Sequence, residues 1–228
     1  MEIKPIAKIY TDFTDKFGIP RQSGLVNSTV GKIVFEPQFR NPDALRGLEA
    51  FSHIWLLWDF SESHREDWSP MVRPPRLGGN KRVGVFASRS PFRPNPIGLS
   101  SVRILKIINE EKLGLVIYVA GADLLNDTPI FDIKPYLPIS DCHNDAIGGF
   151  SDEHKNDNLE VTVSTELIEM IPEDKRESLI DILSQDPRPS YQEDPSRIYG
   201  MQYAGYEIKF SVDKRILTVK NISKNNFK

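Results

Sequence analysis

The chain has almost no cysteine, since Cys142 is the single one among its 228 residues. An internal disulfide is therefore excluded, which fits a reducing compartment. Long apolar runs are also lacking. The most apolar stretch, residues 52–60, is far shorter than the ~20 residues of a transmembrane helix. The first residues lack the apolar core of a signal peptide. These absences predict a soluble, cytoplasmic protein with no membrane span.

Several chemical signatures are missing as well. The chain contains no P-loop, no G-x-G-x-x-G opening a helix and no nucleophile elbow. Its histidines are scattered and form no H-x-x-x-H pair, so we predict no metal site. P-loop enzymes, doubly wound dinucleotide enzymes, elbow-type serine hydrolases and enzymes with a paired-histidine metal site are therefore disfavoured.

One segment contains no acidic residue, although the chain as a whole has a net charge of −3. Residues 68–109 carry eight Lys and Arg side chains, separated by prolines and glycines that exclude a helix. Because the rest of the chain is not basic, any contact with nucleic acid should be local. Guanidinium groups on a stiff backbone suit phosphates and carboxylates. We therefore expect rigid loops around a positively charged pocket.

Short strands dominate the first part of the expected fold. Apolar runs that alternate or are continuous predict them at residues 3–10, 29–35, 51–60, 81–87, 100–108, 112–120 and 128–133. Residues 42–48, with asparagine before proline, predict one short helix. Many short strands with little helix favour a β-barrel or a β-sandwich.

The pattern changes after a polar stretch at residues 140–158, which we predict to be a linker. Residues 172–183 begin with proline and acids and have apolar residues at helical spacing, which predicts a helix. Two alternating runs at 206–212 and 216–222 predict a hairpin. The prediction is a mainly β protein, with a β domain over residues 1–145 and a small α+β domain over residues 146–228.

The polar loops contain segments that closely resemble the TsaA-like (TrmO) family of S-adenosylmethionine-dependent tRNA methyltransferases. The matching segments are FGIPRQSGLV from Phe17, RGLEAFSHIWLLWDF from Arg46, VRPPRLGGNKRVGVFASRSPFRPNPIGLS from Val72, ADLLNDTPIFDIKPYLP from Ala122 and DPRPSY from Asp186. They occur in family order, and the longest is too specific to arise by chance. The resemblance spans nearly the whole chain.

The resemblance implies a β-barrel catalytic domain, a homodimer and methylation of N6 of threonylcarbamoyladenosine at position 37, beside the anticodon of tRNA. By motif position, it implies that S-adenosylmethionine contacts Pro20, Arg21, Gln22, Ser61, Glu62, Arg89, Leu99, Asp123, Leu124, Leu125 and Asn126. Two positions depart from the family pattern. Ser61-Glu62 stands where the family commonly has His-Gln, and Asn126 stands where it usually has Asp.

The basic side chains are candidates for contact with tRNA phosphates and with the threonyl carboxylate. These candidates are Arg73, Arg76, Lys81, Arg82 and Arg93. For Arg73, Arg76 and Arg103, ion pairs within the protein or across a dimer are an equally supported alternative. We expect Trp55 and Trp58 to be core or dimer contacts, whereas Trp68 is the better candidate for stacking on a base.

The target nitrogen of the implied reaction belongs to a urea-like group and is a poor nucleophile. It needs deprotonation, or a donor that stabilises charge on the adjacent carbonyl oxygen. Asp132, His64 and Tyr136 are the candidates, and the sequence does not choose among them. Two other functions stay open: a non-catalytic module of the same fold that binds a nucleotide or RNA, and a scaffold that uses its C-terminal part for protein contacts.

Overall fold

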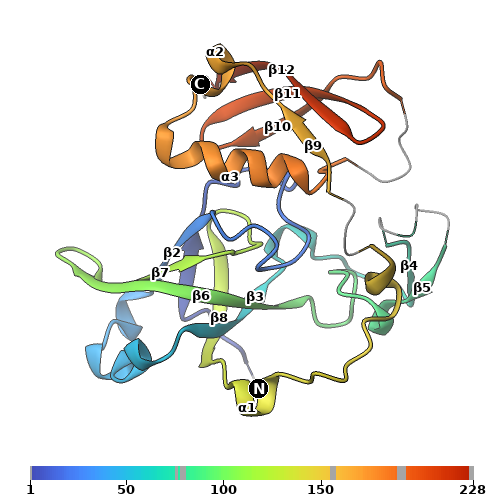
Figure 1. Ribbon diagram of the computed structural model, residues 1–228. Helices are drawn as coiled ribbons and strands as arrows, with labels where there is room; N and C mark the ends of the chain where they lie inside the picture. The colour runs from blue at the N-terminus through green and yellow to red at the C-terminus, as the bar shows by residue number, and fades with distance from the viewer. Residues whose placement is uncertain (1, 75–76, 78–80, 155–157, 189–193, 226–228) are drawn as a thin grey trace.

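A closed six-stranded barrel forms the first half of the protein. The computed structural model describes residues 2–74, 77, 81–154, 158–188 and 194–225. The barrel order is β1-β2-β7-β6-β3-β8, and every neighbouring pair is antiparallel (Figure 1). The strands are β1 (Ala7–Tyr10), β2 (Val30–Phe35), β3 (His53–Asp59), β6 (Ile97–Glu110), β7 (Gly114–Ala120) and β8 (Thr128–Pro135). The predicted mainly β fold with a barrel is confirmed.

Strand β3 shows how the sequence fills this barrel. Ile54, Leu56 and Trp58 point inward and are buried, while Trp55 and Leu57 between them are only half-buried. The continuous apolar run predicted a buried strand. An antiparallel barrel covers only the inner face of each strand, so the outer face keeps some apolar surface.

The loops between strands differ most from the prediction. The strand expected at residues 81–87 is reduced to β5 (Val83–Gly84), which pairs only with β4 (Met71–Val72) outside the barrel. A 3-10 turn, Val85–Ala87, follows it. The helix expected at residues 42–48 is a 3-10 turn, Pro42–Leu45, which ends at the extended Arg46 (ψ 122°), and Gly47 follows in the left-handed region at φ 89°. Further 3-10 turns are Pro37–Phe39, Leu48–Ala50, Ser61–Ser63 and Gly149–His154.

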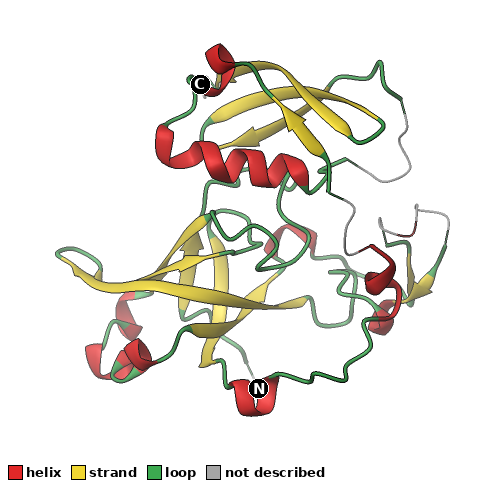
Figure 2. Ribbon diagram, viewed as in Figure 1, coloured by secondary structure: helices red, strands yellow, loops and turns green. Residues whose placement is uncertain are grey.

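A four-stranded sheet with one long helix forms the second half, as Figure 2 shows. Its order is β10-β11-β12-β9, with β9 parallel to β12. The strands are β9 (Glu160–Thr162), β10 (Tyr199–Tyr203), β11 (Tyr206–Asp213) and β12 (Ile216–Lys224). Its helices are α2 (Thr165–Ile168) and α3 (Glu173–Ser184), whereas α1 (Pro138–Asp141) lies against the barrel, where Trp55 Nε1 donates to Asp141 Oδ2. The α+β character is confirmed; the short parallel strand β9 was not foreseen.

Helix α3 lies between its own sheet and the barrel (Figure 1). No helix among the described residues combines the length and apolar character needed to cross a bilayer. The placement of a domain boundary at residue 145 stays a prediction. Two residues from the N-terminal part of the sequence, Phe13 and Val26, belong to the apolar core of the C-terminal half.

The β1–β2 loop, residues 11–29, joins the two halves. Phe13 and Val26 belong to the core of the C-terminal half, and the Phe13 ring lies 5.7 Å from that of Tyr203. Lys175 of α3 forms an ion pair of 2.5 Å with Asp12. The backbone N–H of Ala204 donates to the carbonyl oxygen of Asp12 at 3.1 Å. The conformation of this loop therefore depends on the C-terminal half.

We predict that Phe13→Ala lowers the free energy of unfolding by about 3–5 kcal/mol. Phe13 is only 1% exposed, so removal of its ring creates a cavity in the core. Phe39→Ala is the matched control, since Phe39 is 37% exposed and its removal should cost less than about 1 kcal/mol. Urea unfolding midpoints measure both. Equal midpoint shifts for the two variants would contradict the anchoring role of Phe13.

Candidate active site

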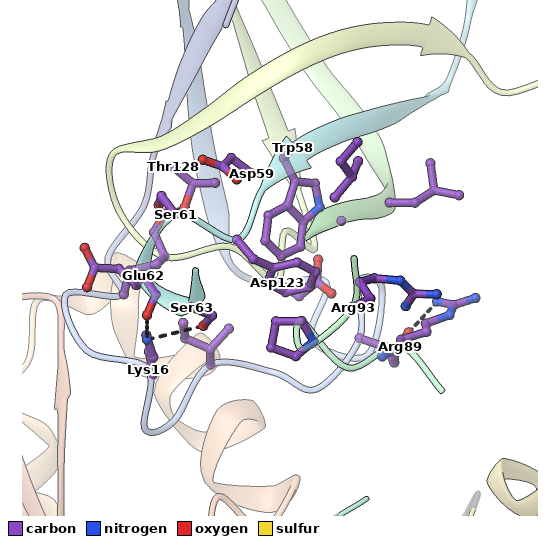
Figure 3. Close-up of a pocket in the computed structure, with 18 of the residues that line it drawn as sticks. Lys16, Trp58, Asp59, Ser61, Glu62, Ser63, Arg89, Arg93, Asp123 and Thr128 are labelled. Carbon is purple, nitrogen blue, oxygen red and sulfur yellow. Dashed lines mark hydrogen bonds between the residues drawn. The ribbon is translucent and has the colours of Figure 1, made fainter. Parts of the chain in front are cut away.

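A cavity of about 620 Å³ opens at the end of the barrel where β3 ends and where β6 and β8 begin. Its volume is in the range of about 300–1,000 Å³ that is usual for small-molecule sites. Four loops converge on it (Figure 3). They are the β1–β2 loop, the turn after β3, the proline-rich loop before β6 and the loop between β7 and β8.

Asp123 lies on the wall of this cavity at the end of a hydrogen-bond chain. The indole N–H of Trp58 donates to Ser100 Oγ at 3.0 Å, and the Ser100 hydroxyl donates to Asp123 Oδ1 at 2.6 Å. Burial raises the pKa of Asp123, although hydrogen bonds from Ser100 and from backbone N–H groups, together with the charge of Arg89, partly offset that rise. This series of hydrogen bonds fixes the orientation of the Asp123 carboxyl group, which faces the cavity.

Trp58 can lie here only because its neighbour is glycine. Gly98 pairs with Trp58 across β3 and β6, and a Cβ atom on Gly98 would lie 2.2 Å from the indole ring. The Trp58 and Phe60 rings, 4.2 Å apart, both line the cavity. Trp58 was expected as a core or dimer contact; it is 8% exposed and belongs to the barrel core as well as to the cavity wall.

Guanidinium groups brace the loops around the cavity. Arg89 donates to Gln22 Oε1, which joins the proline-rich loop to the β1–β2 loop. Arg93 Nη1 donates to the carbonyl oxygens of Ser88 at 3.2 Å and of Ser90 at 3.4 Å, within its own loop. Arg89 and Arg93 both line the cavity. Two of the arginines expected on stiff loops therefore lie on the wall of this cavity.

Arg21 connects the cavity to the C-terminal half. Its Nη2 donates to the carbonyl oxygens of Asp186 at 3.2 Å and of Arg188 at 3.0 Å. Arg188 in turn forms an ion pair of 2.8 Å with Asp186. The first residues of the DPRPSY segment, Asp186 to Arg188, thus hold the β1–β2 loop in place through Arg21. The last residues of the segment, 189–191, lie outside the described part of the chain.

The cavity also carries negative charge, which makes it chemically mixed. Asp59, Glu62 and Asp123 lie on its lining together with three arginines and Lys16. Lys16 donates to the carbonyl oxygen of Glu62 and, at 3.4 Å, to Ser63 Oγ (Figure 3). A ligand with both a cationic and an anionic group would match such a lining.

Nine of the eleven residues predicted to bind the cofactor line this cavity: Pro20, Arg21, Gln22, Ser61, Glu62, Arg89, Leu99, Asp123 and Leu125. The other two lie beside it. Leu124 is fully buried in the barrel core, and Asn126 Oδ1 accepts a hydrogen bond of 3.1 Å from the backbone N–H of Thr11. The assignment of all eleven residues to cofactor binding stays a prediction.

The three candidates for proton transfer lie apart from one another. His64 Nε2 is 2.6 Å from Asp59 Oδ1, so it contacts a residue of the cavity wall. Asp132 pairs with Lys134 at 2.8 Å and borders a groove toward the other end of the barrel. The Tyr136 ring lies 5.5 Å from Trp55. Neither Asp132 nor Tyr136 lines the cavity.

The basic candidates divide into two groups. Arg93 lines the cavity, whereas Arg73, Lys81 and Arg82 are exposed around the β4–β5 ladder. Arg76 lies outside the described residues. Arg73 and Arg103, for which internal ion pairs were an alternative, form none with another described residue.

Sequence reasoning missed several lining residues: Lys16, Asp59, Ser88, Asn95 and Thr128. Asp59 had a usable signal, because it ends an apolar strand directly before the polar turn that carries Ser61 and Glu62. Lys16 gave none. Within the described parts of the chain, no group of three His, Cys, Asp or Glu residues could hold a metal ion.

Two family models match this chain. The N-terminal domain model of tRNA-methyltransferase O matches residues 8–142, and the C-terminal domain model matches residues 156–225. An Escherichia coli K12 protein, tRNA (adenine(37)-N6)-methyltransferase, is 36% identical over 92% of this chain and 93% of its own. A putative S-adenosylmethionine-dependent methyltransferase of Pseudomonas aeruginosa is 39% identical over 88% of this chain and 87% of its own.

The fold is shared with a solved structure. The crystal structure of TrmO from Pseudomonas aeruginosa superposes with a TM-score of 0.77 at 30% identity, and the match covers 98% of each chain. The sequence matches and the structural match therefore both extend over the two halves of the molecule, and they include the loops that surround the cavity. The chain belongs to the tRNA-methyltransferase O family.

Proposed function

We propose that this protein transfers a methyl group from S-adenosylmethionine to N6 of adenosine 37 in tRNA, with threonylcarbamoyladenosine as the form of the base that it accepts. The observation that carries the proposal is the convergence of four family-matching loops on one cavity with a lining of mixed charge. Such convergence from distant parts of the sequence is typical of a site and is not required by barrel packing.

The lining suits the chemical groups of S-adenosylmethionine. Trp58 and Phe60 offer aromatic surface for the adenine ring. Asp123 and Glu62 can accept hydrogen bonds from ribose hydroxyls or the amino group, and Arg21 or Arg89 can face the carboxylate. When bound, this cofactor supplies an electrophilic methyl group on a sulfonium. The role of the protein is then mainly to align the reacting atoms, which can contribute several kcal/mol.

His64 is our choice among the three candidates for proton acceptor, because it contacts the cavity-lining Asp59. A carboxylate on one ring nitrogen fixes the orientation of an imidazole and leaves the other nitrogen to accept a proton. Arg93 can face the carboxylate of the threonylcarbamoyl group from the same wall. Phosphates of the tRNA would meet Arg73, Arg76, Lys81 and Arg82, and the protein would act in the cytoplasm.

The proposal is tested by methyl transfer from labelled S-adenosylmethionine to two tRNA samples. We expect transfer to tRNA that carries threonylcarbamoyladenosine at position 37 and none to the unmodified transcript, because N6 of unmodified adenosine is not part of a urea group and carries no threonyl carboxylate for Arg93 to face. Cofactor binding by titration calorimetry without any transfer would instead favour a binding module. Absence of cofactor binding would favour a scaffold.

Asp123→Asn should weaken cofactor binding about 10- to 100-fold, because hydrogen bonds to a charged acceptor are lost. The same change should stabilise the fold at neutral pH. The folded-state pKa of Asp123 is raised, so ionisation costs stability above that pKa, and the cost disappears below the unfolded-state pKa. The stabilisation of the variant should therefore shrink as pH falls.

Glu62→Gln is the matched control for Asp123→Asn. It makes the same change of charge on the same cavity, but Glu62 is exposed, so its stability should not follow this pH dependence. Calorimetric titration with the cofactor and urea midpoints between acid and neutral pH provide the two measurements. Unchanged cofactor affinity of Asp123→Asn would remove Asp123 from the site.

We further propose that the protein is a homodimer through the outer wall of the barrel at β3, β6 and α1. Half-buried Leu57 pairs in register with Leu99, which is 53% exposed. Ile139 of α1 is 96% exposed, and α1 is tied to this wall because Trp55 Nε1 donates to Asp141 Oδ2 at 2.8 Å. A second copy would cover these apolar groups, and it would bring its own face, including Asp132 and Tyr136, toward the cavity rim at Leu99.

Ile139→Glu should raise the dissociation constant of this dimer at least about tenfold, because it places an unpaired charge in an apolar contact. Because Ile139 is exposed, the substitution should leave the fold of the protomer intact. Ile216→Glu is the control, since Ile216 is 46% exposed at the start of β12 in the other half of the molecule. Sedimentation velocity over a range of concentrations measures both. A dimer unaffected by Ile139→Glu would place the interface elsewhere.

A further inference from the structure

Two exposed aromatic rings stack on each other next to the cavity loops. The Trp68 and Phe86 ring centroids lie 5.9 Å apart, with an interplanar angle of 24°. Phe86 is 71% exposed, more than any other aromatic side chain in the described residues, and Trp68 is 46% exposed. Their mutual contact leaves most of the Phe86 ring in solvent. Packing of the protein alone gives no reason for this exposure.

The backbone holds the pair in place. Trp68 precedes β4, and Phe86 follows β5, so the small ladder brings them together. The N–H of Val85 donates to the carbonyl oxygen of Pro70 at 3.0 Å. Val85 itself is 1% exposed, and the 3-10 turn that buries it turns Phe86 outward. Rings fixed in this way lose little conformational entropy when a ligand binds.

The pair lies at the rim of the cavity. Arg89, a lining residue, is three residues beyond Phe86, so their Cα atoms are at most about 11 Å apart. On the other side, the N–H of Ser69, adjacent to Trp68, donates to the carbonyl oxygen of Phe92 at 3.1 Å. In the sequence, Phe92 lies between Arg89 and Arg93, which both line the cavity. Figure 1 shows β4 and β5 at the edge of the molecule.

Basic side chains follow the pair in the sequence, although the exposed Glu66 and Asp67 directly precede Trp68. Arg73, Lys81 and Arg82 are exposed on the same ladder region, and residues 68–109 contain no acidic side chain. The Arg65 guanidinium lies 3.6 Å from the centre of the Phe92 ring. Aromatic faces together with positive charge are the combination that binds single-stranded nucleic acid, through base stacking and phosphate contacts.

We propose that Trp68 and Phe86 form a stacking platform for an unpaired base of the tRNA anticodon loop that neighbours the methylated adenosine; this inference rests on the proposed function. The target adenosine must leave the stack of the loop to enter the cavity, which leaves its neighbour without a stacking partner. A ring pair at the cavity rim replaces that partner. RNA loops are commonly recognised through splayed bases on aromatic side chains.

An RNA loop is the occupant that the surroundings favour. A lipid surface would need a larger apolar face, whereas here two rings adjoin a cavity and a run of basic side chains. A protein partner would gain from any apolar side chain of similar size at position 86. A stacked base requires an aromatic face, so conservative substitutions separate these cases.

The test measures binding of an anticodon stem-loop RNA with 2-aminopurine beside position 37, at several salt concentrations. Trp68→Ala and Phe86→Ala should each weaken binding about 5- to 100-fold with an unchanged salt slope, because stacking neutralises no phosphate. Both variants should keep wild-type affinity for S-adenosylmethionine. Lys81→Ala combined with Arg82→Ala is the electrostatic control, which should flatten the slope of log K against log salt by up to about two.

Two further variants decide whether stacking is the interaction. Phe86→Tyr should bind the RNA and quench 2-aminopurine fluorescence as the wild type does. Phe86→Leu should show the same loss of binding and quenching as Phe86→Ala. Full binding by Phe86→Leu, or unchanged binding by both alanine variants, would overturn the platform. So would wild-type binding to phosphatidylserine vesicles that Phe86→Ala abolishes. Failure of the wild type to methylate tRNA would overturn the proposed function, yet the stem-loop measurements would still decide the platform.

Discussion

The packing of the β1–β2 loop onto the C-terminal half is the interaction on which the site depends. Phe13 and Val26, on either side of this loop, are buried in the core of the other half. Between them the loop presents Pro20, Arg21 and Gln22 to the cavity. A loop of this length would be mobile by itself, since loops lack regular backbone hydrogen bonds. Here its ends are fixed by apolar burial, and its middle is fixed by hydrogen bonds from Arg21 to the backbone beyond α3.

This arrangement gives the C-terminal half a structural role in a site to which it contributes no lining residue in the described part of the chain. Helix α3 contributes Lys175 and Asp181, which contact Asp12 and Ser28 at the two ends of the loop. Opening the contact between the halves would release the loop, and with it Gln22, the hydrogen-bond partner of Arg89. Two of the four cavity loops would then lose their mutual support. Stability of the interface and order of the cavity are therefore coupled.

The sequence predicted the fold well wherever local patterning decides the structure. The barrel strands, helix α3 and the β11–β12 hairpin follow from periodicity and turn residues, which act over a few positions. Strand β9 did not, because three residues carry too little pattern and its pairing with β12 is contributed by the rest of the sheet. The strand expected around Val83 was shortened for a similar reason: outside the barrel, β4 alone remains to extend its ladder.

The candidate site was predictable to the extent that motif residues mark it. Recognised segments located nine lining residues, and Asp59 could have been added from its place at the end of an apolar strand, but Lys16 enters only through the tertiary fold. The chain from Trp58 through Ser100 to Asp123 joins three strands or loops, so no spacing in the sequence encodes it. The same holds for the stacked pair, since Trp68 and Phe86 flank a ladder whose pairing is not apparent from either segment.

Features that cost folding free energy cluster at one end of the barrel. A buried carboxyl group at Asp123, whose pKa is raised by desolvation, opposes folding when it is ionised. The exposed Phe86 ring contributes little to the core. Gly98 gives up a side chain so that Trp58 can occupy its place. At the same end, Arg89 and Arg93 line one cavity on a loop that also contains Pro91. Sites retain such costs when a ligand repays them, because binding to the native state alone shifts the folding equilibrium. The ligand that we propose combines a cofactor with both cationic and anionic groups in the cavity and an RNA loop on its rim, and the carboxyl group, the arginines and the rings each match one part of it.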